Sequence, residues 1–168
     1  MDNKKEQDKI IGVIGLGYVG LPLSLAFSDF FKVVGFDNNY KRIEELNTGV
    51  DRNRDIVFNK KKNLSFSNSE NDLSVCNIYI VTVPTPVTKD NIPDLSFLKN
   101  ATQLIGKYLK IGDIVIYEST VYPGVTEDIC APILEKISSL KKYKKHRNKK
   151  ICQNTKIKKR QANYTQNI

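Results

Sequence analysis

Short apolar runs alternate along the chain with segments in which apolar residues repeat at helical spacing. The apolar runs, which predict buried strands, lie at 10–14, 32–36, 64–66, 77–83 and 114–117. The helical spacings, which predict helices, lie at 18–30, 40–46, 95–109 and 125–138. Residues 50–63 are polar and irregular, and we expect no element there. Strands that alternate with helices predict right-handed crossovers, and hence a parallel sheet covered on both faces.

This order predicts an α/β fold, namely a Rossmann-type, doubly wound, mostly parallel sheet in a single domain. We place the domain at 10–140, between a polar extension at 1–9 and a basic tail at 141–168. A chain of 168 residues suffices for one domain with its own core but is short for a two-domain enzyme. No apolar run approaches the roughly 18–20 residues of a membrane helix, and the polar N-terminus does not resemble a secretory signal. We therefore expect no membrane span and a cytoplasmic location.

The strongest local motif is Gly15-Leu16-Gly17-Tyr18-Val19-Gly20, which has the spacing G-x-G-x-x-G. It follows a predicted strand and opens a predicted helix, which is the context that a dinucleotide site requires. Gly15 permits the tight turn, Gly17 lets the backbone approach a pyrophosphate, and Gly20 lets the helix pack closely on the strand. The alternative is that the three glycines are only packing devices in another doubly wound domain.

An acidic residue about 20 positions after the first glycine is the third part of this pattern, and Asp37 occupies it at the end of the second strand. A carboxylate accepts hydrogen bonds from ribose hydroxyls and repels a 2′-phosphate, so Asp37 favours NAD over NADP. Arg42 leaves NADP as the alternative cofactor, because an arginine near this site can accommodate a 2′-phosphate.

Two further segments end strands at the same predicted edge of the sheet. Residues 81–86 (Val-Thr-Val-Pro-Thr-Pro) end one strand, and residues 118–120 (Glu-Ser-Thr) end the next. Ligands of open α/β sheets lie outside the carboxyl ends of the strands, so both segments should face the cofactor. For Thr85 and Thr120, local capping or turn formation is an equally good interpretation.

Cysteine and histidine are too sparse and too scattered to build a metal site. Cys76, Cys130 and Cys152 lie far apart without a CxxC pair, and His146 is the only histidine. We therefore expect no metal ligands and no disulfide framework.

Together these segments resemble the UDP-glucose/GDP-mannose dehydrogenase family. The resemblance is carried by GLGYVGLPL at 15–23, GFD at 35–37, VPTP at 83–86 and ESTVYPG at 118–124, and it covers roughly 9–140. It is strongest to the branch that oxidises UDP-N-acetylglucosamine or UDP-N-acetylgalactosamine at C6 for Vi-antigen and capsule synthesis. The resemblance implies NAD as cofactor and a two-step oxidation of a UDP-sugar to a UDP-uronic acid.

The resemblance also implies residue roles. Gly15, Tyr18, Val19 and Gly20 would line the phosphates, Asp37 and Arg42 would hold the adenosine ribose, and Val83 would pass near the nicotinamide. Thr120 would lie beside the cofactor and the reacting centre, where it would position a catalytic water. The full expected cofactor-binding set is Gly15, Gly17, Tyr18, Val19, Gly20, Asp37, Arg42, Val83, Pro84, Thr85 and Thr120.

Later motifs of the family are not found in this sequence. They are a Pro-Glu-Arg segment with a catalytic glutamate, a lysine and an asparagine of the oxyanion site, and a glycine-rich segment with the nucleophilic cysteine. We therefore expect a sheet that lacks its last strand and exposes that edge, and a chain that is inactive alone. A UDP-sugar would be a partner only if the missing C-terminal half were supplied.

The net charge of +9 comes from the tail. Eleven of the 27 basic residues and none of the 18 acidic residues lie in 141–168, so the first 140 residues hold 16 basic and 18 acidic side chains. We expect a disordered tail and hypothesise that it is out-of-frame translation after a frameshift or truncation. Other hypotheses are a non-catalytic NAD-binding module, and a basic-tail protein that binds nucleic acid or a membrane surface. No specific nucleic-acid partner is expected.

Overall fold

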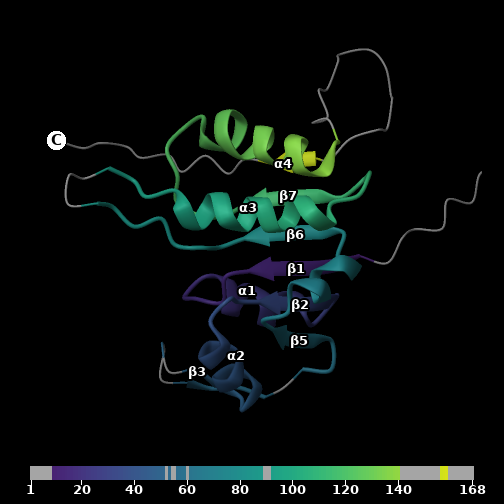
Figure 1. The fold of residues 1–168 in the computed structure, drawn as a ribbon. Coiled ribbons are helices and arrows are strands. Elements are labelled where there is room, and N and C mark those ends of the chain that lie inside the picture. Colours follow the sequence, from purple (N-terminus) through teal and green to yellow (C-terminus); the bar gives the residue numbers. More distant parts are fainter. Residues whose placement is uncertain are drawn as a thin grey trace, which may run out of the picture.

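The chain folds around one parallel sheet with helices on both faces (Figure 1). The computed structural model describes residues 9–51, 53, 56–59, 61–88, 92–140 and 156–158. The strands of the main sheet, in chain order, are β1 (Ile10–Ile14), β2 (Lys32–Phe36), β5 (Leu64–Ser67), β6 (Ile78–Val81), β7 (Ile114–Tyr117) and β8 (Lys156–Lys158). Their spatial order is β5-β2-β1-β6-β7-β8, and every pair is parallel. This is the 3-2-1-4-5-6 order of a Rossmann-type sheet, as the sequence predicts.

All four predicted helices are present. They are α1 (Gly20–Phe27), α2 (Tyr40–Asn47), α3 (Ser96–Tyr108) and a last helix that begins as a π-helical segment (Val125–Cys130) and continues as α4 (Ala131–Ser138). Asn39 caps α2, since its side chain accepts a hydrogen bond from Arg42 N at 3.3 Å.

Alternate strand residues build a core on each face of the sheet. On one face, Ile14, Val81 and Val115 pack with α3 and α4. On the other face, Val13 and Ile80 pack with side chains of α1 and α2. Because successive strand residues point to opposite sides, two covered faces require the nearly continuous apolar strands seen in the sequence.

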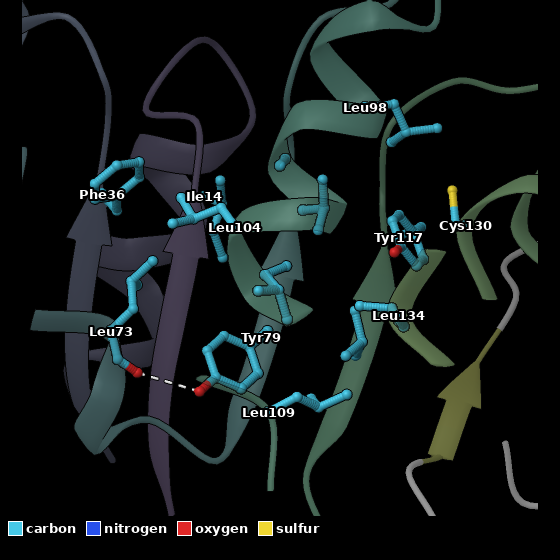
Figure 2. Packing of buried hydrophobic residues seen from close by; sticks show 14 of the residues in the cluster. Ile14, Phe36, Leu73, Tyr79, Leu98, Leu104, Leu109, Tyr117, Cys130 and Leu134 are labelled. Carbon is cyan, nitrogen blue, oxygen red and sulfur yellow. Dashed lines mark hydrogen bonds between the residues drawn. The ribbon is translucent and has the colours of Figure 1, made fainter. Parts of the chain in front are cut away.

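The α3–α4 face also contains buried hydroxyl and thiol groups (Figure 2). The Tyr79 hydroxyl lies 3.1 Å from Leu73 O, and the Thr102 hydroxyl lies 3.0 Å from the Tyr117 hydroxyl. Cys130 lies beside Tyr117 in the same layer. Each of these polar groups has a hydrogen-bond partner, as burial requires.

The expectation that the sheet lacks its last strand is wrong. Lys156–Lys158 pairs in parallel with β7, which gives the sheet six strands. The sequence gives no signal for this strand, because pairing at an open edge uses backbone groups and needs no apolar pattern. The rest of 141–168, with Cys152 and His146, lies outside the described residues, as do 1–8.

Helix α1 is shorter than predicted and turns an unexpected side to the sheet. The apolar stripe that predicts it includes Val19 and Phe30, and these side chains are 51% and 80% exposed. The side buried against the sheet consists of Gly20, Leu21 and Ser24. Gly20 is needed there because the helix starts against the loop that follows β1, where a Cβ would overlap Gly15 O.

Two elements escape prediction because they are too short to show a period. Residues 50–63, where no element is expected, contain an antiparallel pair formed by β3 (Val50–Asp51) and β4 (Ile56–Val57). A 3-10 helix, Glu70–Val75, precedes β6. Among the described residues, no helix combines the length and the apolar character needed to cross a bilayer.

Asp113, which precedes β7, carries a carboxylate that is buried at 4% exposure. Burial raises its pKa from an ordinary 3.8 to about 6, and the hydrogen bond from Lys110 N opposes this only in part. Because the pKa is higher in the folded state than in the unfolded state, folding favours the protonated carboxyl. The stabilisation that Asp113 contributes is therefore full below about pH 4, and it is lost as the pH rises through 6. Asp113→Asn should therefore raise the free energy of unfolding at neutral pH by about 2 kcal/mol.

Urea denaturation between about pH 4 and pH 7 measures this effect, and the difference between wild type and Asp113→Asn should grow with pH. Glu44→Gln, which removes an exposed carboxylate from α2, is the control and should leave the difference near zero at every pH. A pH slope in Asp113→Asn equal to that of the wild type would contradict the assignment.

Candidate functional site

The site lies where four neighbouring strands end at one edge of the sheet. Residue pairing places Ile14 opposite both Phe36 and Val81, and Val81 opposite Tyr117. The segments that leave these strands are therefore brought together, although the first and the last are about a hundred residues apart in sequence. They are the glycine loop, Asp37, the segment 82–86 and the segment 118–124.

The glycine loop turns sharply at Gly15. This residue has a φ of +96°, which favours glycine, and its N–H donates to Phe36 O at 2.8 Å. Gly20, at the end of the loop, packs against Gly15 at its start. A Cβ on Gly20 would overlap Gly15 O and lie 2.5 Å from the Thr82 hydroxyl oxygen. The expected roles of these two glycines, a tight turn and close packing, therefore agree with their positions.

Gly17 differs from both of them, since a Cβ at this position would meet no protein atom within 4 Å. Tyr18 and Val19 beside it are 63% and 51% exposed. Val19 is the N-cap of α1, and its apolar side chain cannot accept a hydrogen bond from the first turn. The loop thus leaves open space above the N-terminus of a helix, an arrangement that suits a phosphate group.

Asp37 is fixed beside the loop by the backbone. Its Oδ2 accepts a hydrogen bond from Leu16 N at 2.8 Å, and its Oδ1 accepts one from Asn39 N at 3.0 Å. Each carboxylate oxygen has a further lone pair, so both can still accept a hydroxyl group of a ribose. The half-buried carboxylate therefore satisfies the requirement of a dinucleotide site at the end of β2.

Arg42 is brought to the same loop but is turned away from solvent. Its Nε donates to Leu16 O at 2.9 Å, and its two terminal nitrogens form ion pairs with Glu45 at 2.7 Å and Asp51 at 2.8 Å. Arg42 is 7% exposed, and the terminal nitrogen that faces Asp51 is buried in an ion pair without forming a hydrogen bond. Direct contact of Arg42 with a ribose or a phosphate stays a prediction.

Hydroxyl groups join the ends of β6 and β7 to each other and to the loop. The Thr85 hydroxyl donates to Thr120 O at 2.6 Å, and the Ser119 hydroxyl donates to Val83 O at 2.7 Å. The Thr82 hydroxyl lies 2.7 Å from Gly15 O. Thr85 and Thr120 are thus adjacent, and the bond between them joins two strand ends, which local capping of either residue would not do.

Thr82 and Ser119 are not among the predicted site residues, although both belong to the segments 81–86 and 118–120 that the sequence pattern indicates. A hydroxyl residue within two positions after a buried parallel strand was the available signal, because such a side chain can reach the neighbouring strand end. Pro84, which lies between these contacts, is exposed at the same edge.

Neither described cysteine has the properties of a nucleophile. Cys76 and Cys130 are buried and free, and burial raises the pKa of the Cys76 thiol to about 12 and also raises that of Cys130. A nucleophilic cysteine needs a lowered pKa and access to substrate. The site therefore offers anion binding, a carboxylate for hydroxyl groups and hydroxyl side chains, without a thiolate among the described residues.

Comparison with known proteins gives one consistent match. Residues 9–157 match the NAD binding domain of the UDP-glucose/GDP-mannose dehydrogenase family. The chain is 51% identical over 138 residues to a UDP-N-acetyl-D-glucosamine 6-dehydrogenase of Pseudomonas aeruginosa, a match that covers 80% of this chain and 33% of that protein. A second such enzyme, from Salmonella typhi, is 48% identical over 133 residues, covering 77% of this chain and 31% of that protein.

A solved structure supports the same match. The UDP-D-ManNAc dehydrogenase from Pyrococcus horikoshii superposes with a TM-score of 0.73 at 30% identity, covering 88% of this chain and 35% of that one. The chain thus spans about a third of the length of the relatives that it matches.

Proposed function

The chain belongs to the UDP-glucose/GDP-mannose dehydrogenase family, and we propose that it supplies the NAD-binding part of a nucleotide-sugar 6-dehydrogenase. The family identifies NAD as the cofactor. The observation that supports this role best is the open space at Gly17 beside the fixed carboxylate of Asp37. The substrate that we propose is a UDP-N-acetylhexosamine, since two of the similar relatives are UDP-N-acetyl-D-glucosamine 6-dehydrogenases.

The proposed division of labour follows the positions of the side chains. The loop from Gly15 to Gly20 holds the pyrophosphate at the N-terminus of α1. Asp37 accepts hydrogen bonds from the adenosine ribose, and Arg42 supports that end of the site through the loop. Val83, Pro84 and Thr85 line the nicotinamide side.

Thr120 stands where β7 ends, next to Thr85, and we propose that its hydroxyl positions a water at the reacting centre. NAD, when bound, supplies the hydride acceptor for each of the two oxidations that convert the sugar alcohol at C6 into a carboxylate. Such products are building blocks for surface polysaccharides, and the proposed location is the cytoplasm.

We further propose that the 168-residue chain binds NAD but does not complete the reaction alone. The sequence contains no Pro-Glu-Arg segment, and the two described cysteines are buried. A UDP-sugar would then bind productively only when the segments that the longer relatives carry are supplied. A non-catalytic NAD-binding module would share the cofactor site and differ in never gaining turnover.

The first test is thermal unfolding of the purified chain with increasing NAD. A ligand that binds only the folded state stabilises it by RT ln(1 + [L]/Kd), so NAD at about ten times its Kd should add roughly 1.4 kcal/mol. NADP at equal concentration is the matched control and should stabilise less, because Asp37 disfavours a 2′-phosphate. The absence of any stabilisation at millimolar NAD would contradict the proposal.

The second test is NADH formation with UDP-N-acetylglucosamine and UDP-N-acetylgalactosamine, followed by absorbance. We expect no steady turnover from this chain alone. Steady turnover would overturn the proposed inactivity and leave NAD binding intact.

A further inference from the structure

Arg42 connects the glycine loop to a carboxylate that lies outside it. Its Nε donates to Leu16 O at 2.9 Å, and one terminal nitrogen lies 2.8 Å from Asp51 Oδ1. The two paired side chains are 8% and 2% exposed. Asp51 belongs to β3, which pairs with β4 in a two-stranded sheet separate from the main one.

The peptide of Leu16 is held from both sides by charged groups. Asp37 accepts a hydrogen bond from its N–H at 2.8 Å, and Arg42 donates one to its C=O. Leu16 stands between Gly15 and Gly17, so the orientation of this peptide sets the direction of the loop that faces the open space. A displaced guanidinium would release one of the two restraints.

A buried ion pair depends on both partners. A buried guanidinium without its carboxylate retains the desolvation cost and loses the compensating charge, so it moves toward water or toward another anion. In the wild type, Nε donates to Leu16 O and one terminal nitrogen donates to Glu45, while the other terminal nitrogen lies 2.8 Å from Asp51 Oδ1 in an ion pair without hydrogen-bond geometry. A phosphate would need the same donors, because arginine binds phosphate through paired N–H groups.

We propose that Asp51 is a positioning residue for the cofactor site. It keeps the Arg42 guanidinium against Leu16 O and away from a 2′-phosphate, and it thereby strengthens, from outside the glycine loop, the preference for NAD over NADP that Asp37 favours. This inference rests on the proposed NAD-binding function, and it assigns a role to a residue of the β3–β4 pair that no motif includes.

The test is to measure the Kd of NAD and of NADP separately for the wild type and for Asp51→Asn by calorimetry. We expect Asp51→Asn to weaken NAD about tenfold and to lower the ratio of the NADP Kd to the NAD Kd at least fivefold. A purely structural defect would weaken both dinucleotides alike and leave the ratio unchanged. Glu44→Gln makes the same charge change on the exposed side of α2 and should alter neither Kd.

Glu45→Gln provides a second, milder variant, because the Glu45 side chain is 14% exposed and its pair with Arg42 lies within one helix. Glu45→Gln should lower the ratio of the NADP Kd to the NAD Kd about twofold to threefold, and it replaces Asp51→Asn in the test if Asp51→Asn does not fold. If the ratio is unchanged in a folded Asp51→Asn, or in Glu45→Gln where Asp51→Asn does not fold, the inference is overturned while NAD binding by the wild type stands. A wild-type chain that binds no NAD would overturn the proposed function and this inference together.

Discussion

Gly20→Ala should unfold the domain or bring it close to unfolding. The added methyl would overlap Gly15 O and lie 2.5 Å from the Thr82 hydroxyl oxygen, so the loop backbone itself would have to shift. Overpacking of a rigid core commonly costs 1–3 kcal/mol, and an overlap with a backbone oxygen should cost at least about 3 kcal/mol. Urea denaturation followed by circular dichroism measures this loss.

The same substitution also tests whether the loop is coupled to β6. Because Thr82 lies 2.7 Å from Gly15 O, displacement of Gly20 should disturb the end of β6 as well as α1. Gly17→Ala is the matched control, since it adds the same methyl three residues earlier in open space. A Gly20→Ala protein with the stability of the wild type would show that the loop does not pack as described.

Gly17→Ala should leave the fold intact and remove most of the affinity for NAD. Its φ lies outside the left-handed region and a Cβ would meet no protein atom within 4 Å, so we expect the free energy of unfolding to change by less than about 1 kcal/mol. The methyl would occupy the space through which a pyrophosphate approaches the loop. We expect the Kd for NAD to rise by about 10- to 100-fold, which corresponds to roughly 1.4–2.8 kcal/mol.

Calorimetric titration of NAD into wild type and Gly17→Ala measures the affinity, and thermal unfolding without ligand verifies that the two proteins are equally folded. NAD affinity that is equal in both folded proteins would mean that the pyrophosphate does not lie against Gly17. It would leave the fold unchallenged.

The sequence predicted those parts of the fold in which hydrophobic period and backbone constraint agree. The bounds of β1, β2 and β7 match the predicted runs, because each is a buried parallel strand with apolar residues on both faces. The β3–β4 pair could not be predicted, since two-residue strands have no period. The edge strand Lys156–Lys158 could not be predicted either, since it pairs through backbone groups.

In the site, too, residues that local backbone geometry requires could be predicted, whereas contacts between distant segments could not. Glycine spacing and Asp37 could be recognised because backbone geometry demands those residues at those positions. The burial of Arg42 against Leu16 could not, because its partner Asp51 lies in a segment without any motif. The hydroxyl contacts of Thr82 and Ser119 depend on strand register, which the sequence gives only in outline.

We expect NAD to bind at the carboxyl ends of β1, β2 and β6, and a titration of NAD followed by amide NMR shifts of the wild-type chain measures where it binds. We expect saturable shifts at Gly15, Gly17, Gly20, Asp37 and Thr85, and little change at Asp113, which lies at the start of β7 and so at the opposite edge of the sheet. The absence of shifts at millimolar NAD, or saturable shifts confined to the strand ends near Asp113, would show that NAD does not bind at the glycine loop.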